Sequence, residues 1–279
     1  MGRTSLRQLK KQQKSDVSTA QHLFIQGYIN RYRKVKAIQA GIFLVLIALW
    51  EILTQCEIMD PFIFSSPSRM ATCFIELSKD GSLFMHLGIT LLETFVSFGV
   101  VTVFGIGLAI LLWWNDTLSQ ILEPYLVVLN SLPKTALAPV FIVWLGNNMK
   151  TIIVAAVSVA VFGTVITLSS QFHSVEEDKI KLIQTLGGTK KDILLQVVLP
   201  SNVPAILSNA KVNIGLSLVG VIIGEFLAAQ AGLGYLIIYG SQVFKLDYVM
   251  LSICILCIVA TGLYKLLSFV EQKYLNHRF

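Results

Sequence analysis

The chain has 279 residues, of which 54% are hydrophobic and 14% are charged, and its mean hydropathy is +0.71. Soluble domains carry about 25% charged residues, so this composition excludes an ordinary soluble domain. Several segments reach the roughly 20 apolar residues that a membrane crossing needs. They use most of the chain and leave no room for a separate soluble enzyme domain. The net charge of +6 lies on the flanks of these segments, which favours a role in topology over nucleic-acid binding.

A basic arm, residues 1–36, precedes the first apolar stretch and carries nine Lys and Arg residues. It is too long and too polar for the n-region of a signal peptide, so we expect the first span to stay in the membrane. Two interpretations of residues 20–36 remain open. They form an interfacial helix with Phe24, Ile25 and Tyr28 toward lipid, or they belong to a solvated arm that fixes orientation.

We predict an all-α integral membrane domain over residues 37–275 with six transmembrane helices. Ser66-Pro67 marks a helix start in the loop after the first span, because proline is favoured at the first helical position. Pro133 and Pro139 interrupt the third span. The predicted spans cover about residues 37–53, 85–113, 121–145, 151–168, 204–226 and 248–269.

The basic residues predict the orientation of these spans. With the N-terminus inside, 16 Lys and Arg residues fall on the cytoplasmic side and four on the other, and Lys134 and Lys211 lie within spans. Positive residues accumulate on the cytoplasmic side of membrane proteins. Both termini are therefore expected in the cytoplasm.

The sequence offers no catalytic constellation. It has no G-x-x-x-x-G-K-[ST] loop to cradle ATP phosphates, and its four histidines are scattered. Cys254 and Cys257 lie in an apolar span without further ligands, so we interpret them as small core residues and expect no metal site. Whether Cys56 pairs with Cys73 in the first loop stays open. We expect a chain that is not an enzyme and holds no cofactor of its own.

The most informative loop covers residues 173–203. Ser174 and Glu177 have capping-box spacing, which predicts a helix from about Val175 to Leu186. Gly187-Gly188 ends this helix, because glycine accepts the positive φ of a helix-closing turn.

A second short helix is expected to follow. Thr189 and Asp192 predict its start, and Leu199-Pro200 its end. The loop is then an amphipathic elbow that either docks into a groove of another protein or packs only on its own bundle. Its expected apolar positions are Ile180, Ile183 and Leu186 in the first helix and Ile193, Val197 and Val198 in the second.

This stretch resembles the cytoplasmic coupling loop of type I, binding-protein-dependent ABC importer permeases. The family pattern is EAA, three residues, Gly, nine residues, Ile, one residue, Leu-Pro. Gly187 fits the glycine, Val197 takes the isoleucine place, and Leu199-Pro200 closes the motif. Lys181 stands where the family usually has glutamate, which puts any glutamate-specific contact in doubt.

The resemblance covers about residues 40–275 and is most similar to the nitrate, sulfonate and taurine subgroup. Residues 131–146, SLPKTALAPVFIVWLG, resemble its third span, and residues 224–237, GEFLAAQAGLGYLI, resemble the segment after its fifth. The stretch before the second span also matches. Glu93 departs from the subgroup, which usually has arginine there.

The resemblance implies a function and partners. The chain would be a permease subunit in the bacterial inner membrane, more often a homodimer than a heterodimer in this subgroup. The elbow, with Lys181, Gly187, Gly188, Thr189, Val197, Leu199 and Pro200, would sit in a cleft of a cytoplasmic ATPase subunit that binds ATP and Mg. An extracytoplasmic binding protein would deliver a small solute such as a sulfonate, nitrate or a vitamin precursor.

Charged residues inside spans are costly and often functional. Glu225 either lines the translocation path or latches the outer gate, or it reaches the interface. Lys134, next to Pro133, either attracts an anionic substrate or pairs with Glu93 or Glu123. Asn209, Lys211 and Asn213 either face a vestibule or pack between helices.

Two other functions are considered. A gradient-driven secondary transporter would use Glu93, Glu225 and Lys134, and it would need no ATPase. A membrane scaffold or sensor would show no solute flux. Both leave the elbow unexplained.

Overall fold

The computed structural model describes residues 19–278. The basic segment before Thr19 lies outside the described residues, as do the side chains of Phe24 and Ile25. The chain divides into two compact units, Met1–Arg69 and Met70–Phe279.

The first unit is built on one long helix, α2 (Thr19–Gln55), followed by the short α3 (Pro61–Phe64). The predicted span 37–53 lies inside α2, which also includes residues 20–36, and Tyr28 is exposed. Asp60 caps α3 by accepting a hydrogen bond from the Phe62 amide at 2.8 Å. The helix start predicted at Ser66-Pro67 is confirmed, because α4 runs Pro67–Lys79.

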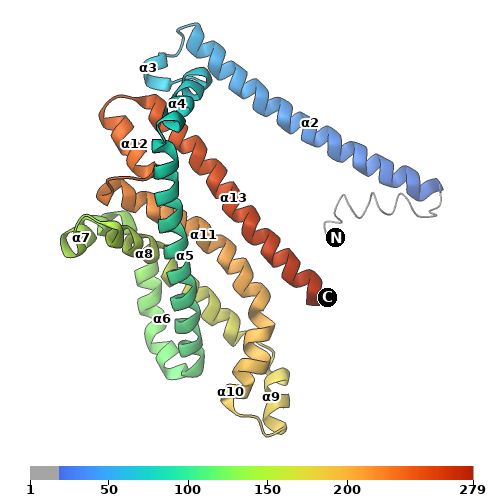
Figure 1. Ribbon diagram of the computed structural model, residues 1–279. Helices are drawn as coiled ribbons and strands as arrows, with labels where there is room; N and C mark the ends of the chain where they lie inside the picture. The colour runs from blue at the N-terminus through green and yellow to red at the C-terminus, as the bar shows by residue number, and fades with distance from the viewer. Residues whose placement is uncertain (1–18, 279) are drawn as a thin grey trace. The chain divides into compact units, whose positions relative to one another are not determined.

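All regular secondary structure among the described residues of the second unit is helical (Figure 1). Its long helices are apolar over most of their length. After the last turns of α4, its helices are α5 (Ser82–Trp114), α6 (Asp116–Ser131), α7 (Lys134–Leu145), α8 (Met149–His173), α9 (Glu177–Thr185), α10 (Lys190–Ile193), the π-helical turn η1 (Leu194–Val198), α11 (Leu199–Ala228), α12 (Leu233–Gln242) and α13 (Leu246–Arg278).

Five helices among the described residues are long and apolar enough to cross a membrane, and the α6–α7 pair makes a sixth if counted as one span. The predicted interruption of the third span at Pro133 is confirmed, and α6 and α7 meet there at an angle of 94°. The interruption predicted at Pro139 is wrong. Leu132 is extended, with ψ 139°. A residue before proline avoids the helical region, so the chain turns at Leu132-Pro133, whereas Pro139 is accommodated inside α7.

Helix α8 packs against both α5 and α11 at the centre of this unit. Small residues allow the close approach: a Cβ on Gly220 would lie 2.6 Å from the Ala156 Cα, and one on Gly224 would lie 2.9 Å from the Ile152 Cα. Figure 1 shows α9 and α10 at one end of the second unit and α12 at the other.

Two further expectations are settled by side-chain positions. Lys211 pairs with Glu271 of α13 at 2.6 Å, and Asn213 bonds Thr164 and Asn209, so these residues pack between helices. All four cysteines are free. The interpretation of Cys254 and Cys257 as core residues is wrong, because both are exposed on α13. Apolar side chains on a membrane helix can face lipid, so hydropathy does not distinguish core from outer surface.

Candidate functional site

The elbow begins two residues later than predicted. Helix α9 has Glu176 as its N-cap, with no side-chain capping bond. The predicted capping box of Ser174 and Glu177 is wrong. Ser174 instead ends α8, and its hydroxyl donates to the Gln171 carbonyl at 2.9 Å. The spacing of the two residues fits a capping box, but Ser174 is the C-cap of α8, and its hydroxyl bonds that helix and not α9.

Gly187 and Gly188 close α9 as predicted. Gly187 has φ +81°. Its N–H donates to the Gln184 carbonyl at 3.0 Å, and the Gly188 N–H donates to the Ile183 carbonyl at 2.9 Å. This pair of bonds is the Schellman closure of a helix. A Cβ on Gly188 would lie 3.0 Å from the Ile183 carbonyl oxygen, so position 188 has no room for a side chain, whereas position 187 needs a residue that accepts positive φ.

The second helix starts at Thr189 as predicted, and a capping box forms its start. The Thr189 N–H donates to Asp192 Oδ2 at 2.8 Å, and the Asp192 N–H donates to Thr189 Oγ1 at 3.4 Å. The predicted end at Leu199-Pro200 is wrong, since the helix continues through η1 into α11. The Leu199 N–H bonds the Leu194 carbonyl, five residues back. A π turn gives the Pro200 ring room that a regular α-helix would deny.

One side of the elbow packs firmly on the bundle. Ile193, Leu194 and Val198 are buried against the ends of α5 and α8, and Val197 is buried as well. Ile180 and Ile183 of α9 pack against the same cluster. The buried partners on the bundle are Ala109 and Trp113 of α5 and Leu168 and Phe172 of α8.

The other side of the elbow exposes two leucines. Leu182 is 59% exposed and Leu186 is 76% exposed. The prediction that Leu186 shares the buried face of Ile180 and Ile183 is therefore wrong, because the helix closes at Thr185 and the turn directs Leu186 outward. The elbow is fixed to its own bundle by one face and leaves an apolar tip free.

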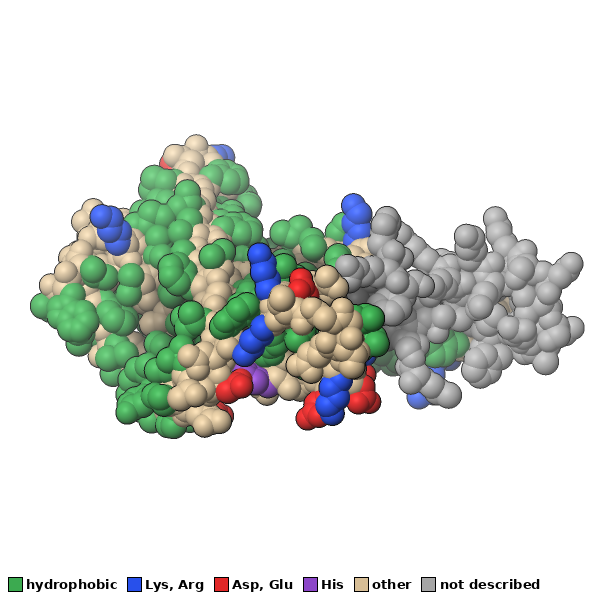
Figure 2. Space-filling model, turned by 90° about the horizontal axis from the view of Figure 1, so that it is seen from below, with side chains coloured by type: hydrophobic (Ala, Val, Ile, Leu, Met, Phe, Trp, Pro, Cys, Tyr) green, Lys and Arg blue, Asp and Glu red, His purple; other side chains and the backbone are tan. Residues whose placement is uncertain are grey.

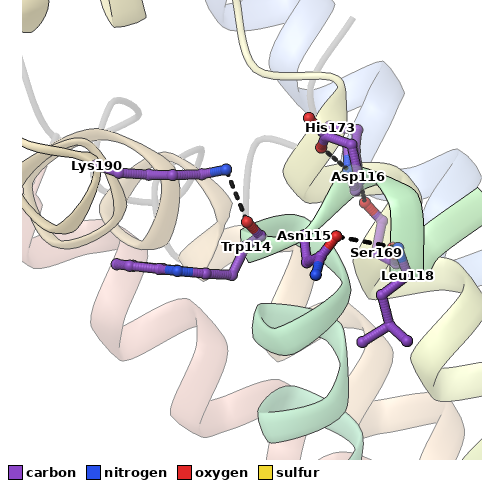
Figure 3. A network of polar contacts seen from close by, with 7 residues as sticks. All are labelled: Trp114, Asn115, Asp116, Leu118, Ser169, His173 and Lys190. Atoms are coloured by element: carbon purple, nitrogen blue, oxygen red, sulfur yellow. Dashed lines mark hydrogen bonds and ion pairs between the residues drawn. The ribbon is translucent and has the colours of Figure 1, made fainter.

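Polar contacts fix the elbow to α5 (Figure 3). The Lys190 ammonium donates to the Trp114 carbonyl at 2.7 Å and lies 5.6 Å from the centre of the Trp113 ring. It thus satisfies a carbonyl at the C-terminus of α5, where cations are favoured. Asn115 begins α6 by accepting a hydrogen bond from the Leu118 amide at 3.1 Å.

A histidine joins the ends of α8 and α6 beside this anchor (Figure 3). His173 Nδ1 donates to the Ser169 carbonyl at 2.7 Å, and Nε2 lies 3.8 Å from Asp116 Oδ1. Both residues line a cavity of about 500 Å³ between α5, α6 and α8, which also includes Glu123. Figure 2, seen from this end, shows charged side chains gathered here and hydrophobic ones around them.

Lys181, which stands at the family's glutamate position, pairs with Glu177 one turn earlier on α9. The Lys181 ammonium donates to Glu177 Oε2 at 2.9 Å. This hydrogen bond and the lysine's charge hold the pKa of the Glu177 carboxyl below its ordinary value. Both side chains are exposed, so the pair supports α9 locally and leaves the elbow's outer tip unchanged.

Lys134 does not pair with either glutamate that the sequence suggested. Its ammonium donates to the carbonyls of Leu129, Asn130 and Leu132 at 2.7, 2.6 and 3.0 Å. These carbonyls lie at the C-terminal end of α6, where the break at Pro133 removes their helical donors. Lys134 therefore stabilises the bend between α6 and α7.

Glu93 and Glu225 are brought together, although they are 132 positions apart in the sequence. They are 2% and 1% exposed, so the option that Glu225 reaches the interface is wrong. Thr90 donates to Glu225 Oε1 at 2.7 Å, and His86 accepts from the Gly232 amide at 2.9 Å.

Sequence reasoning missed His86 and Thr90. A signal was present: residues 86, 90, 93 and 97 are polar within a mostly apolar helix and recur at helical spacing.

The fold and the elbow define a multi-pass membrane transport subunit. The chain belongs to the family described as binding-protein-dependent transport system inner membrane component, whose model matches residues 101–279. It is thus an inner-membrane permease subunit of the ATP-driven importers of small solutes, and the predicted class and location are confirmed.

Named relatives agree with this assignment. A formylaminopyrimidine transport permease protein of Halalkalibacterium halodurans is 30% identical over 69% of this chain and 76% of its own. The taurine transport system permease protein of Escherichia coli is 24% identical over 79% and 82%. The nitrate import permease protein of Leptolyngbya laminosa is 24% identical over 83% and 85%.

The fold is similar to that of a chain in inward-facing structures of the MetNI methionine ABC transporter. The TM-score is 0.59 at 20% identity, over 70% of this chain and 95% of that chain.

Proposed function

We propose that two copies of this chain form the membrane part of an importer and move a small solute inward by alternating access. Cytoplasmic ATPase subunits, which bind ATP and Mg²⁺, drive the motion. An extracytoplasmic binding protein delivers the solute. Rigid-body movement of packed helices about a fixed site is the general form of such cycles.

The elbow carries the proposal. Its inner face is fixed by the buried cluster and by the bond from Lys190 to the Trp114 carbonyl. Its outer tip offers Leu182 and Leu186 to a partner. An amphipathic helix with exposed apolar anchors fits a hydrophobic groove on another protein. Because the inner face packs against α5, α8 and α11, a displacement of α9 would be transmitted to three membrane helices.

For the solute, we propose a compact molecule with a pyrimidine-like ring, or a small anion such as a sulfonate or nitrate. The first relative above transports formylaminopyrimidine by name, and others are named for taurine and nitrate. Lys134 gives no support to anion binding, because its ammonium is used by three backbone carbonyls.

The coupling proposal is tested by co-purification of the tagged permease with its ATPase. Leu186→Asp places a charge at the elbow's tip and is expected to reduce the recovered ATPase at least tenfold. Ile58→Asp is a matched control, because Ile58 is 72% exposed but lies between α2 and α3. Equal ATPase recovery in both variants would contradict docking through the elbow.

The solute proposal is tested by uptake into cells that express the permease, its ATPase and its binding protein. Labelled formylaminopyrimidine, taurine and nitrate are compared. Uptake of one of them that requires all three components supports the proposal. Uptake that continues without the ATPase would favour a gradient-driven transporter.

A further inference from the structure

Two buried carboxyl groups meet between α5 and α11. Glu93 lies one helical turn after Thr90 on α5, Thr90 donates to Glu225 Oε1, and both carboxyl groups are buried, so the two groups face the same contact between α5 and α11. None of the ion pairs found among the described residues involves either of them. Two carboxylates in contact at a buried site cannot both carry a charge. One proton between them would remove the repulsion and would let one carboxyl group donate to the other.

Their other partners indicate which group carries the proton. Glu225 accepts from the Thr90 hydroxyl at 2.7 Å and from the Gly234 amide at 2.5 Å. An ionised carboxylate suits this position, because it only accepts and lies at the positive N-terminus of α12. Glu93 Oε2 has no hydrogen-bond partner. A buried oxygen without a hydrogen-bond partner costs less free energy in a neutral carboxylic acid than in a charged carboxylate, so we place the proton on Glu93.

The pair belongs to a larger contact that fastens the start of α12. The Gly232 amide donates to His86 Nδ1 at 2.9 Å, and the Leu233 amide donates to Thr90 Oγ1 at 2.8 Å. With the Gly234 bond to Glu225, three consecutive amides at the α12 N-terminus are satisfied by α5 and α11. A Cβ at Gly234 would lie 2.8 Å from Glu225 Oε2, so glycine lets the carboxylate approach.

The surroundings supply few other titratable groups. On α5 there is His86, and on α12 there is Tyr235, whose ring stacks on His86 at 5.9 Å. Helix α8 faces α11 at this level with Ile152 and Ala156, which carry no charge. Helix α13 packs against α12 with Leu256 and Tyr248.

We propose that Glu93 and Glu225 form a proton-binding site that keeps α12 fastened to α5 and α11. The ligand is a single hydrogen ion, held by Glu93 and shared with the Glu225 carboxylate. Loss of this proton would leave two negative charges in contact and would loosen the start of α12. By linkage, a folded state that holds more protons than the unfolded chain loses stability as pH rises.

The test is infrared spectroscopy of the purified protein in lipid nanodiscs at pH 7. A buried, protonated carboxyl gives a C=O stretching band that shifts in D₂O. We expect this band in the wild type and its loss in Glu93→Gln. The control Glu123→Gln makes the same change at an exposed carboxyl and should keep the band.

Thermal melting between pH 6 and pH 9 gives a second, independent measurement. The wild type is expected to melt at lower temperature as pH rises, and Glu93→Gln, which keeps a donor toward Glu225, should lose most of this dependence. If Glu93→Gln does not fold, the wild-type band must itself disappear as pH rises. A wild type without the band, a band that persists in Glu93→Gln, or stability that depends on Na⁺ rather than pH would overturn the proposal.

Discussion

A single lysine holds the break between α6 and α7. Lys134→Met keeps the apolar stem and removes the ammonium, which leaves three carbonyls without their donor. Unsatisfied buried polar groups cost about 1–3 kcal/mol each, and partial solvation of this site lowers that cost. We expect a clear drop in the melting temperature of the detergent-solubilised protein. Lys150→Met, at an exposed position, is the control, and an equal drop there would argue against the capping role.

Gly187 gives a residue-level test of the elbow. Gly187 has φ +81°, and nothing lies within 4 Å of an added Cβ, so only the backbone conformation restricts which residue fits at this position. Asn accepts this region and β-branched residues do not. Gly187→Val is expected to cost about 1–3 kcal/mol locally and to speed tryptic cleavage at Lys181 and Lys190, whereas Gly187→Asn should remain close to wild type. Equal cleavage rates in the two variants would contradict this account of the turn.

Individual residue roles were only partly accessible from the sequence. The Gly187-Gly188 turn and the helix start at Thr189 were predicted correctly, because both depend on residues within a few positions. The Glu93–Glu225 contact was not predicted, because it joins two helices whose mutual rotation is set by packing. The direction of Leu186 was missed because it depends on where α9 ends.

At the scale of elements, α8 and α11 depend on small residues at their contact. A methyl group at Gly220 would meet the Ala156 backbone at 2.6 Å. Overpacking of this kind costs about 1–3 kcal/mol, so Gly220→Ala should lower the melting temperature. Gly215→Ala is the matched control on the same helix, because nothing lies within 4 Å of its added Cβ. It should be neutral or stabilising, and a destabilising effect equal to that of Gly220→Ala would contradict this packing.

The elements themselves were largely predictable from hydropathy. Each predicted span falls within or across observed helices. A stretch of about 20 apolar residues in lipid must form a helix, because only then do its backbone N–H and C=O groups find hydrogen-bond partners. The interruption at Pro133 was predicted, but its angle of 94° and the continuous passage from α10 into α11 were not. Both concern prolines, which break a helix at Pro133 and are accommodated by a π turn at Pro200. Sequence alone does not distinguish these outcomes.

At the scale of the whole molecule, the distribution of Lys and Arg predicts that the elbow faces the cytoplasm. With the four native cysteines replaced by serine, Leu186→Cys should react with an impermeant thiol reagent only after the cells are opened. Gln230→Cys, in the exposed turn between α11 and α12, should react in intact cells. The opposite pattern would reverse the proposed topology.

Site-specific cross-linking at the elbow's tip tests the central claim most directly. Leu186→Cys, in the same cysteine-free background, carries a photoactivatable group in membranes that contain the complete transporter. We predict a covalent product between this chain and the ATPase subunit, and no such product from Gln230→Cys. A product from position 230 alone, or none from position 186 in membranes that import solute with ATP, would contradict coupling through this elbow.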